Sequence, residues 1–405
     1  MLSEIRLFNY KAFIEEKISL KPVTIFIGPN GSGKSSVASA LYALSTALRL
    51  GLRAAFPEGF FSVYNIRNFN AEKFGYNYAP IGIGLSGATN SAKFDYDIFF
   101  SEDSNSETGY YINYEGLNLK GDGFEYHFNN GKKPELSFAL PTFGSSGWID
   151  RLPAKPQRDC LFNIFEDYSI KEPLFSALKN IRKYMQLMSK YQFQAVAARR
   201  PCDRYDGSGR QPFLKADASN LAEVMQFLQE EQRGLWVKLK DWVRRYADGS
   251  NKIVDLGVAI IEDTVFLNFF EEGTSRKTFQ VRGPLLSDGY WIFTAFACLA
   301  ANSSLPSIAF FEEPESHLHP HKLPLLIEVF KSMTSRTDSQ PCQVLISSHS
   351  PYFLDLFKEM PDSVIFLNKG QAKNLTDIEN YEKILSLYSL GEAWYSNVFD
   401  WGNPK

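Results

Sequence analysis

Hydrophobic and polar positions change their period along the chain, and the first stretch predicts a strand, a glycine-rich turn and a helix. IRLF near the N-terminus alternates apolar and polar residues, which predicts a half-buried strand. VTIFI is a continuous apolar run, which is typical of a strand covered on both faces. It runs into GPNGSGKS, and after that Val37, Ala40, Leu41, Leu44 and Leu48 recur at helical spacing.

The middle of the chain predicts an antiparallel sheet followed by helices. In KFDYDIFF apolar residues occupy alternate positions, and turn-like stretches such as SEDSNSETG and NNGKK separate further alternating pieces, so residues 92–140 predict an antiparallel meander. Residues 159–247 carry apolar stripes at helical spacing. Residues 253–283 return to strand character in VAII, VFLNFF and TFQV, with the turn-like EGTS between them.

The last third alternates strands and helices, in the order SIAFF, KLPLLIEVFKSM, QVLISS, PYFLDLF and SVIFL. Strands that alternate with helices favour a mostly parallel sheet. Because only one such strand–helix unit lies near the N-terminus, we expect one α/β domain built from both chain ends. The predicted ranges are 1–91 with 284–405 for this domain, 92–158 for an antiparallel β insertion, and 159–283 for a helical insertion that ends in strands.

Composition adds few constraints. Apolar residues make up 44% and charged residues 22% of the 405 residues, as in ordinary soluble proteins, and the net charge of −3 gives no general attraction to nucleic acid or membranes. The four cysteines form no CxxC pair, which argues against a disulfide framework and a zinc ribbon. The N-terminus lacks the apolar core of a signal peptide, and no apolar run is long enough to cross a bilayer. We therefore expect a cytoplasmic protein without a membrane partner.

GPNGSGKS matches the GxxxxGK[ST] pattern of a phosphate-binding loop, with the strand before it and the helix after it that the pattern requires. Glycines let several backbone N–H groups point at one phosphate, and the helix N-terminus adds its positive end. Lys34 would reach the β- and γ-phosphates, and the Ser35 hydroxyl would hold Mg²⁺. The residues expected to bind ATP here are Gly28, Pro29, Asn30, Gly31, Ser32, Gly33, Lys34, Ser35 and Ser36.

The stretch FFEEPESHLHPH places acids and histidines directly after a predicted strand. A phosphate-binding loop needs an acid at the end of a neighbouring strand to hold Mg²⁺ through water, and Glu312 has this position. Glu313 would be the base that positions the attacking water. Zinc bound by His317, His319 and His321 is the alternative for this stretch, although Pro320 and the acids fit a turn better than the extended strand that such a site needs.

Two further segments predict contacts to an anion. His349 follows the apolar strand in QVLISSHSP, so it would lie at the same sheet edge as Glu312 and touch the γ-phosphate. In PLLSDGYW, Ser287 and Gly289 would cap a helix that begins at Tyr290, with Asp288 between them, and form a second anion-binding helix end. SDG is also an ordinary turn, so this segment alone is a weak signal.

Together these motifs resemble the ABC-type ATPase superfamily, and within it the RecF, SMC and OLD branch of ATPases in DNA maintenance and phage defence. The resemblance covers residues 1–50 and 280–370 and is carried by IRLFNYKAF, GPNGSGKSS, LLSDG, FFEEPESHLHPH and SSHSP. It implies that Gly28–Ser35 is the Walker A loop, Glu312 the Walker B acid, Glu313 the catalytic base and His349 the switch histidine. Ser287–Gly289 would be the signature segment.

In this superfamily the signature of one subunit closes over ATP bound to the other, so the resemblance implies a head-to-tail homodimer or a larger homo-oligomer. The sequence departs from the usual pattern in three ways: the Walker B acid is Glu, the signature is LSDGY rather than LSGGQ, and His319 stands where an Asp is frequent. These departures resemble OLD-like ATPases. A transporter ATPase would not need the long insertion before the signature, and residues 350–405 are too short for a TOPRIM nuclease domain.

Three hypotheses of function follow. The first is an ATP-hydrolysing switch that dimerises on ATP and controls a separate effector, such as a nuclease or toxin, in bacterial defence against phage. The second is a RecF-like ATPase of DNA repair, with Lys11 and arginines 199, 200, 204 and 210 as a basic patch for DNA. The third is a module that binds ATP without turnover. The sequence leaves DNA open as a partner.

Overall fold

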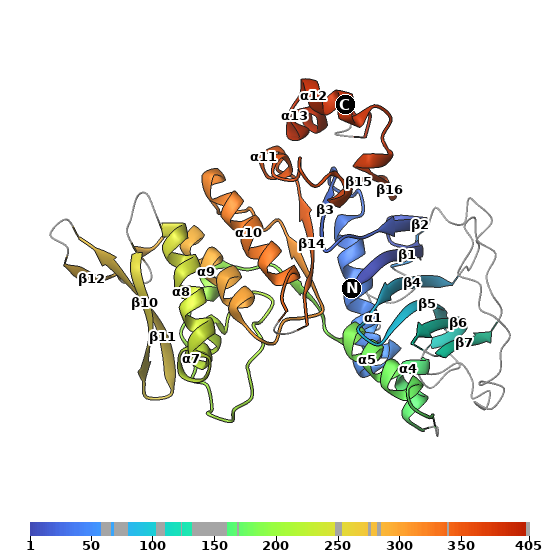
Figure 1. The fold of residues 1–405 in the computed structure, drawn as a ribbon, viewed down its shortest axis with the longest axis horizontal. Helices are drawn as coiled ribbons and strands as arrows, with labels where there is room; N and C mark the ends of the chain where they lie inside the picture. Colours follow the sequence, from blue (N-terminus) through green and yellow to red (C-terminus); the bar gives the residue numbers. More distant parts are fainter. Residues whose placement is uncertain are drawn as a thin grey trace. The chain divides into compact units, whose positions relative to one another are not determined.

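The structure is a computed structural model, and it describes residues 1–57, 66–68, 80–102, 110–122, 124–131, 160–167, 170–247, 253–273, 277–281, 285–337 and 340–401. The chain divides into two compact units (Figure 1). Unit 1 combines residues 1–188 and 360–405, and unit 2 comprises residues 189–359. Both chain ends therefore belong to one unit. The domain ranges expected from the sequence, with 284–405 joined to 1–91, stay a prediction.

Unit 1 contains an antiparallel sheet with the strand order β2-β1-β4-β5-β6-β7. The predicted meander is confirmed for β5 to β7, while residues 132–159 of the region lie outside the described residues, as do most of SEDSNSETG and part of EGTS. The strands are β1 (Leu2–Tyr10), β2 (Phe13–Ser19), β4 (Ile81–Ala88), β5 (Ala92–Glu102), β6 (Tyr110–Gly121) and β7 (Phe124–Gly131).

The first strand is buried on both faces, whereas its alternating pattern predicts a half-buried strand. The side chain of Arg6 is only 4% exposed. Its Nε donates to Oδ1 of Asp97 at 2.8 Å, and its Nη1 lies 2.6 Å from Oε1 of Glu4. The prediction of an exposed polar face is wrong here because a charged residue is buried when a partner of opposite charge is buried with it.

Unit 1 also contains the strand order β16-β15-β3, in which β3 (Val23–Ile27) and β15 (Val364–Asn368) are parallel and β16 (Gln371–Asn374) is antiparallel to β15. All five residues of β3 are buried, as its apolar run predicts. Helix α1 (Lys34–Leu50) follows β3 and contacts α5. The other helices in the described part of unit 1 are α2 (Leu52–Ala55), α4 (Leu161–Ile164), α5 (Leu174–Gln186), α12 (Tyr381–Leu387) and α13 (Leu390–Tyr395), with 3₁₀ turns at Phe165–Asp167, Pro361–Ser363 and Leu375–Asp377.

Unit 2 contains the parallel strands β13 (Ile308–Glu312) and β14 (Gln343–Ser348), with β8 (Met188–Tyr191) next to β13 in the strand order. Helix α9 (Asp288–Ala301) is buried at nearly every position, and α8 (Arg233–Ala247), α10 (Leu323–Thr334) and α6 (Ala195–Ala198) contact it. The expected alternation of strands and helices in the last third is confirmed. The short helix predicted in PYFLDLF is α11 (Pro351–Asp355).

A second antiparallel sheet of unit 2 contains β10 (Ile253–Ile261), β11 (Thr264–Glu272) and β12 (Thr278–Val281), and a short strand, β9 (Cys202–Asp203), pairs with β11. Helix α7 (Leu221–Glu231) contacts both β10 and β11, and α8 contacts β10 (Figure 1). The strand character expected for residues 253–283 is confirmed where the chain is described. Within the described ranges, no helix combines the length and apolar character needed to cross a bilayer.

Candidate nucleotide-binding site

The loop between β3 and α1 has a backbone that only glycine fits at several positions. Gly31 has φ 75° and Gly33 has φ 118°, both in the left-handed region that favours glycine. A Cβ on Gly28 would lie 2.1 Å from the carbonyl oxygen of Leu367, and one on Gly33 would lie 2.7 Å from the ring of Phe13. The glycines therefore allow both the tight curl of the loop and its close packing against neighbouring strands of unit 1.

Lys34 is held inside this loop. Its Nζ donates to the carbonyl oxygens of Gly28 at 2.7 Å and Pro29 at 2.9 Å, and its side chain is 7% exposed. Asn30 and Ser35 are exposed, and Ser36 is half-buried. The ammonium group thus lies at the centre of the loop, while the Ser35 hydroxyl is open to solvent at the start of α1.

The loop has the features that a bound phosphate would complete. The N-cap of α1 is Gly33, so no side chain caps the helix, and its first turn carries no acid. The first amide groups of a helix need acceptors, and the helix dipole favours an anion there. Ser32 Oγ is buried and has no hydrogen-bond partner among the described residues. The residues of this loop therefore fit the phosphates of ATP.

In unit 2 the two predicted acids stand at the end of β13. Glu312 is 14% exposed, and its Oε2 lies 2.9 Å from Nζ of Lys190 on β8. Glu313 follows in the left-handed region, with φ 43°, and its backbone N–H donates to the carbonyl of Ser347 on β14 at 2.9 Å. The two neighbouring carboxylates therefore have different surroundings. The ion pair with Lys190 could not be predicted from the sequence pattern, because Lys190 lies in a short strand that is far from the acids along the chain.

His349 and Glu313 lie close together, at the sheet edge where the sequence places His349 with Glu312. β13 and β14 pair in parallel with Glu312 opposite Ser347, so the residues that follow both strands share one edge. His349 Nε2 is 3.7 Å from Oε1 of Glu313. The side chain of His349 is 33% exposed and that of Glu313 is 54% exposed. An imidazole and a carboxylate at this separation form a pair that a small polar ligand can reach.

Glu315 belongs to the same edge, although the sequence patterns assign it no role. Its carboxylate accepts a hydrogen bond from Ser348 Oγ, and its Oε2 is buried without a hydrogen-bond partner in the described part of the chain. Burial raises the pKa of Glu315 from its ordinary value of 4.5 to about 7, although the Ser348 hydrogen bond acts in the opposite direction. The sequence signal that would have indicated it is an acid placed between two apolar packing positions, Pro314 and Leu318.

The predicted second anion-binding segment begins helix α9. The helix starts at Asp288 with Ser287 as N-cap, rather than at Tyr290, and the Ser287 side chain makes no capping hydrogen bond. Ser287 is exposed, whereas Gly289 is buried so tightly that a Cβ would lie 2.5 Å from Tyr246 Oη and 2.9 Å from the carbonyl of His317. Asp288 lies 2.5 Å from Nη2 of Arg199, a residue that the sequence placed in a basic patch.

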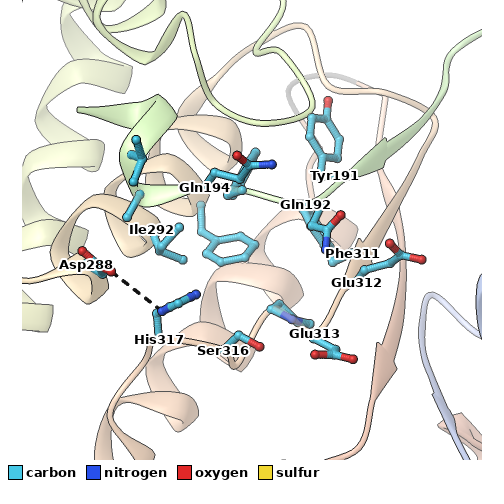
Figure 2. Close-up of a pocket in the computed structure, with 15 residues that line it drawn as sticks. Tyr191, Gln192, Gln194, Asp288, Ile292, Phe311, Glu312, Glu313, Ser316 and His317 are labelled. Carbon is cyan, nitrogen blue, oxygen red and sulfur yellow. Dashed lines mark ion pairs between the residues drawn. The ribbon is translucent and has the colours of Figure 1, made fainter. Parts of the chain in front are cut away.

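A cavity of about 360 Å³ in unit 2 is lined by Asp288 of the predicted signature segment and by Glu312 and Glu313 at the end of β13 (Figure 2). Phe193, Phe296 and Phe311 contact one another through their rings along its lining, and Tyr191 stacks on Phe311. Polar groups from three segments of the chain also line it. These groups are Gln192, Gln194, Asp288, Glu312, Glu313 and His317. Within unit 2, the predicted signature segment and the acids after β13 therefore border one polar cavity with an aromatic wall.

The structure gives no support to the zinc alternative. His317 Nδ1 lies 3.9 Å from Oδ2 of Asp288, whereas the rings of His319 and His321 stack on each other with centroids 5.2 Å apart. Among the residues that the structure describes, no three His, Cys, Asp or Glu side chains gather closely enough to hold a metal ion.

A glycine-rich loop between a buried strand and a helix, in an α/β fold with acids at a strand end, defines a P-loop ATPase. The chain belongs to the AAA ATPase domain family, whose model matches residues 1–354. It is therefore an ATP hydrolase by family, and the predicted α/β ATPase fold and enzyme class are confirmed.

Three solved structures are similar in fold to the chain. One is an SmcHead bound to the C-winged helix domain of ScpA, with 12% identity, a TM-score of 0.40, and coverage of 92% of this chain and 97% of that chain. The SMC head domain from Thermotoga maritima has the same identity and TM-score and covers 92% and 98%. An Smc head with an extended coiled coil, bound to the C-terminal domain of ScpA derived from Pyrococcus furiosus, has 15% identity, a TM-score of 0.36, and coverage of 95% and 98%. The search of curated proteins found no match.

Proposed function

We propose that the chain is a switch that dimerises head-to-tail on binding ATP, opens on hydrolysis and controls a separate effector protein. The observation that carries this proposal is the Glu313–His349 pair, 3.7 Å apart after two parallel strands. A carboxylate at a strand edge can orient a water for attack on a phosphate, and an imidazole beside it can donate a hydrogen bond to that phosphate. A module that only held ATP would not need this pair.

In the proposed mechanism, Lys34 exchanges the carbonyl oxygens of Gly28 and Pro29 for the β- and γ-phosphate oxygens. Ser32 and the uncapped first turn of α1 supply further donors to the phosphates. Ser35 and, through water, Glu312 would hold Mg²⁺, which neutralises charge on the phosphate oxygens when it is bound.

Glu313 would orient the attacking water and accept its proton, because its carboxylate is exposed beside His349, whereas the carboxylate of Glu312 pairs with Lys190. His349 would donate a hydrogen bond to the γ-phosphate and thereby report whether it is present. Ser287, Asp288 and Gly289 would meet the nucleotide held by a second copy, so that closure of the dimer depends on ATP.

The effector and the setting rest on the resemblance to OLD-like ATPases. We propose a nuclease or toxin as the effector and bacterial defence against phage as the setting. A nuclease-like open reading frame beside this one would support that proposal, whereas replication genes would support the RecF-like alternative. The alternative has weaker support in the side chains, because the guanidinium group of Arg199 already pairs with the carboxylate of Asp288.

The substitution Glu313→Gln tests the catalytic part of the proposal. We expect the steady-state rate of phosphate release by the full chain to fall by about 100-fold or more, because a general base contributes on the order of 10² to 10⁴. ATP-dependent self-association, measured by sedimentation velocity, should persist in the variant. Glu231→Gln, which changes an exposed glutamate of the same unit, is the control. Equal turnover by the wild type and Glu313→Gln would refute the catalytic role and favour a module without turnover.

A further inference from the structure

The proposed signature segment carries a charge that should oppose its role. Asp288 is the first residue of α9, at the place where the segment would face the triphosphate of a second copy. A carboxylate there repels the phosphates, since like charges brought together at an interface weaken association. The sequence therefore needs a group that cancels the charge of Asp288 without blocking the helix end.

Arg199 is placed to do this. Its Nη2 lies 2.5 Å from Oδ1 of Asp288 and donates to the carbonyl oxygen of Leu286 at 2.8 Å. The two side chains are 26% and 45% exposed, so the pair lies at the surface of unit 2 rather than in its core. Arg199 is the residue at the C-terminal end of α6, and α6 packs against α9. The position of Arg199 is therefore fixed next to the signature segment, which begins α9.

The charges around Asp288 are few. In the part of the chain that the structure describes, the other group within ion-pair distance is His317, whose Nδ1 lies 3.9 Å from the second carboxylate oxygen (Figure 2). A guanidinium group is charged at all relevant pH values, so the Arg199–Asp288 pair is neutral as a unit. With Asp288 neutralised, the positive end of the α9 dipole is left to face an anion.

The geometry points to Arg199 as the positioning residue of the signature segment. It would neutralise Asp288 and hold the backbone at Leu286, so that Ser287 and Gly289 meet the triphosphate bound to a second copy. This inference rests on the proposed function. It assigns Arg199 to nucleotide-dependent dimerisation, in place of the DNA-binding patch predicted from the sequence, and it explains how an aspartate is accommodated within LSDGY.

The test measures ATP-dependent self-association of the full chain by sedimentation velocity. All variants are made in the Glu313→Gln background, in which ATP is expected to be consumed at least about 100-fold more slowly. Arg199→Gln should raise the ATP concentration needed for association by about tenfold, because it leaves Asp288 as an uncompensated charge at the interface. Arg233→Gln makes the same charge change at an exposed position of α8 and is the matched control.

The double variant Arg199→Gln/Asp288→Asn separates charge compensation from a merely structural role. If Arg199 acts by cancelling the carboxylate, removing that charge should restore association to within about threefold of the parent, because the two residues are coupled. A double variant as weak as Arg199→Gln would overturn the inference, and so would an Arg199→Gln variant that associates like the parent. If the parent itself shows no association with ATP, the proposed function fails first. A parent that associates while the double variant shows no rescue overturns only the role of Arg199.

Discussion

At the scale of single residues, Glu315 is the most unusual group near the strand edge. It is an acid whose pKa burial raises to about 7, next to a chain of polar residues at the ends of β13 and β14. A raised pKa means that the folded state binds a proton more tightly than the unfolded state does. The contribution of Glu315 to stability is therefore full below pH 4.5 and is lost as the pH rises through 7.

We predict that Glu315→Gln flattens this part of the pH dependence. Raising a carboxyl pKa from 4.5 to about 7 corresponds to about 3 kcal/mol of unfolding free energy. The wild type loses this contribution as the pH rises, whereas a glutamine, which does not titrate, has none to lose. The difference in unfolding free energy between variant and wild type should thus become more favourable to the variant from pH 5 to pH 8. Chemical denaturation at both pH values measures it, with Glu231→Gln as control. Parallel pH profiles for wild type and Glu315→Gln would contradict the prediction.

Residues of the candidate site differ in how far the sequence predicts them. Lys34 and the loop glycines follow from one contiguous pattern, and the pairing of Glu313 with His349 follows because parallel strands bring their carboxyl ends to one edge. The partners Lys190 and Arg199 do not follow, since each ion pair joins segments that are far apart in the chain. A run of arginines in a sequence also gives no sign of which of them is paired.

At the scale of elements, three neighbouring strands of unit 1 depend on one glycine. Arg6 on β1 stands opposite Gly84 on β4, and Gly84 stands opposite Asp97 on β5. The Arg6 side chain reaches Asp97 across the glycine, with Nε 2.8 Å from Oδ1. A Cβ on Gly84 would lie 2.0 Å from Oδ1 of Asp97 and 2.7 Å from Nε of Arg6. Because Gly84 has no side chain, the side chains of Arg6 and Asp97 can meet above its Cα and form the buried ion pair.

Replacement Gly84→Ala should therefore break the pair. Breaking a buried ion pair costs roughly 3–5 kcal/mol, far more than the usual effect of a methyl group in a strand, and the second partner of Arg6, Glu4, leaves Asp97 as the carboxylate without its arginine. We expect the free energy of unfolding in urea, followed by circular dichroism, to fall by about this amount. The matched control is Gly257→Ala in strand β10, where the nearest atom to a new Cβ is on the Phe270 ring at 3.7 Å. If both variants are equally stable, the close packing at Gly84 carries no energetic weight.

The kinds of elements were predictable to a large extent, because each depends on residues within a few positions of one another. The buried strand β3, the helix α1, the strands β13, β14 and β15 and the meander all follow from local patterns of burial. The two-sided burial of β1 does not, because it depends on Asp97, which is distant in the chain. Likewise, α9 begins two residues earlier than expected, since the boundary is set by backbone geometry at Ser287 rather than by apolar spacing.

At the scale of the whole molecule, the proposed functional residues are divided between the two units. Unit 1 contains the phosphate-binding loop, Gly28–Ser36, and unit 2 contains the acids after β13, His349 and the segment Ser287–Gly289. Local patterns predict each of these groups, whereas the domain ranges expected from the sequence stay a prediction, because a unit is defined by contacts between distant parts of the chain. In a head-to-tail dimer, each nucleotide would use the loop of one copy and the signature segment of the other.

Mixing two inactive variants tests this arrangement. Lys34→Ala removes the loop lysine, and Ser287→Arg places a bulky side chain at an exposed position of the signature segment. Each variant alone should hydrolyse ATP at a small fraction of the wild-type rate. In an equimolar mixture, half of the dimers are mixed, and each mixed dimer has one intact site made from the Ser287→Arg loop and the Lys34→Ala signature. The mixture should therefore recover about a quarter of the wild-type rate of phosphate release, because in a two-fold dimer the loop of each copy meets the signature segment of the other. If each site were instead completed within one chain, every site would carry one lesion, and the mixture would be as inactive as its components.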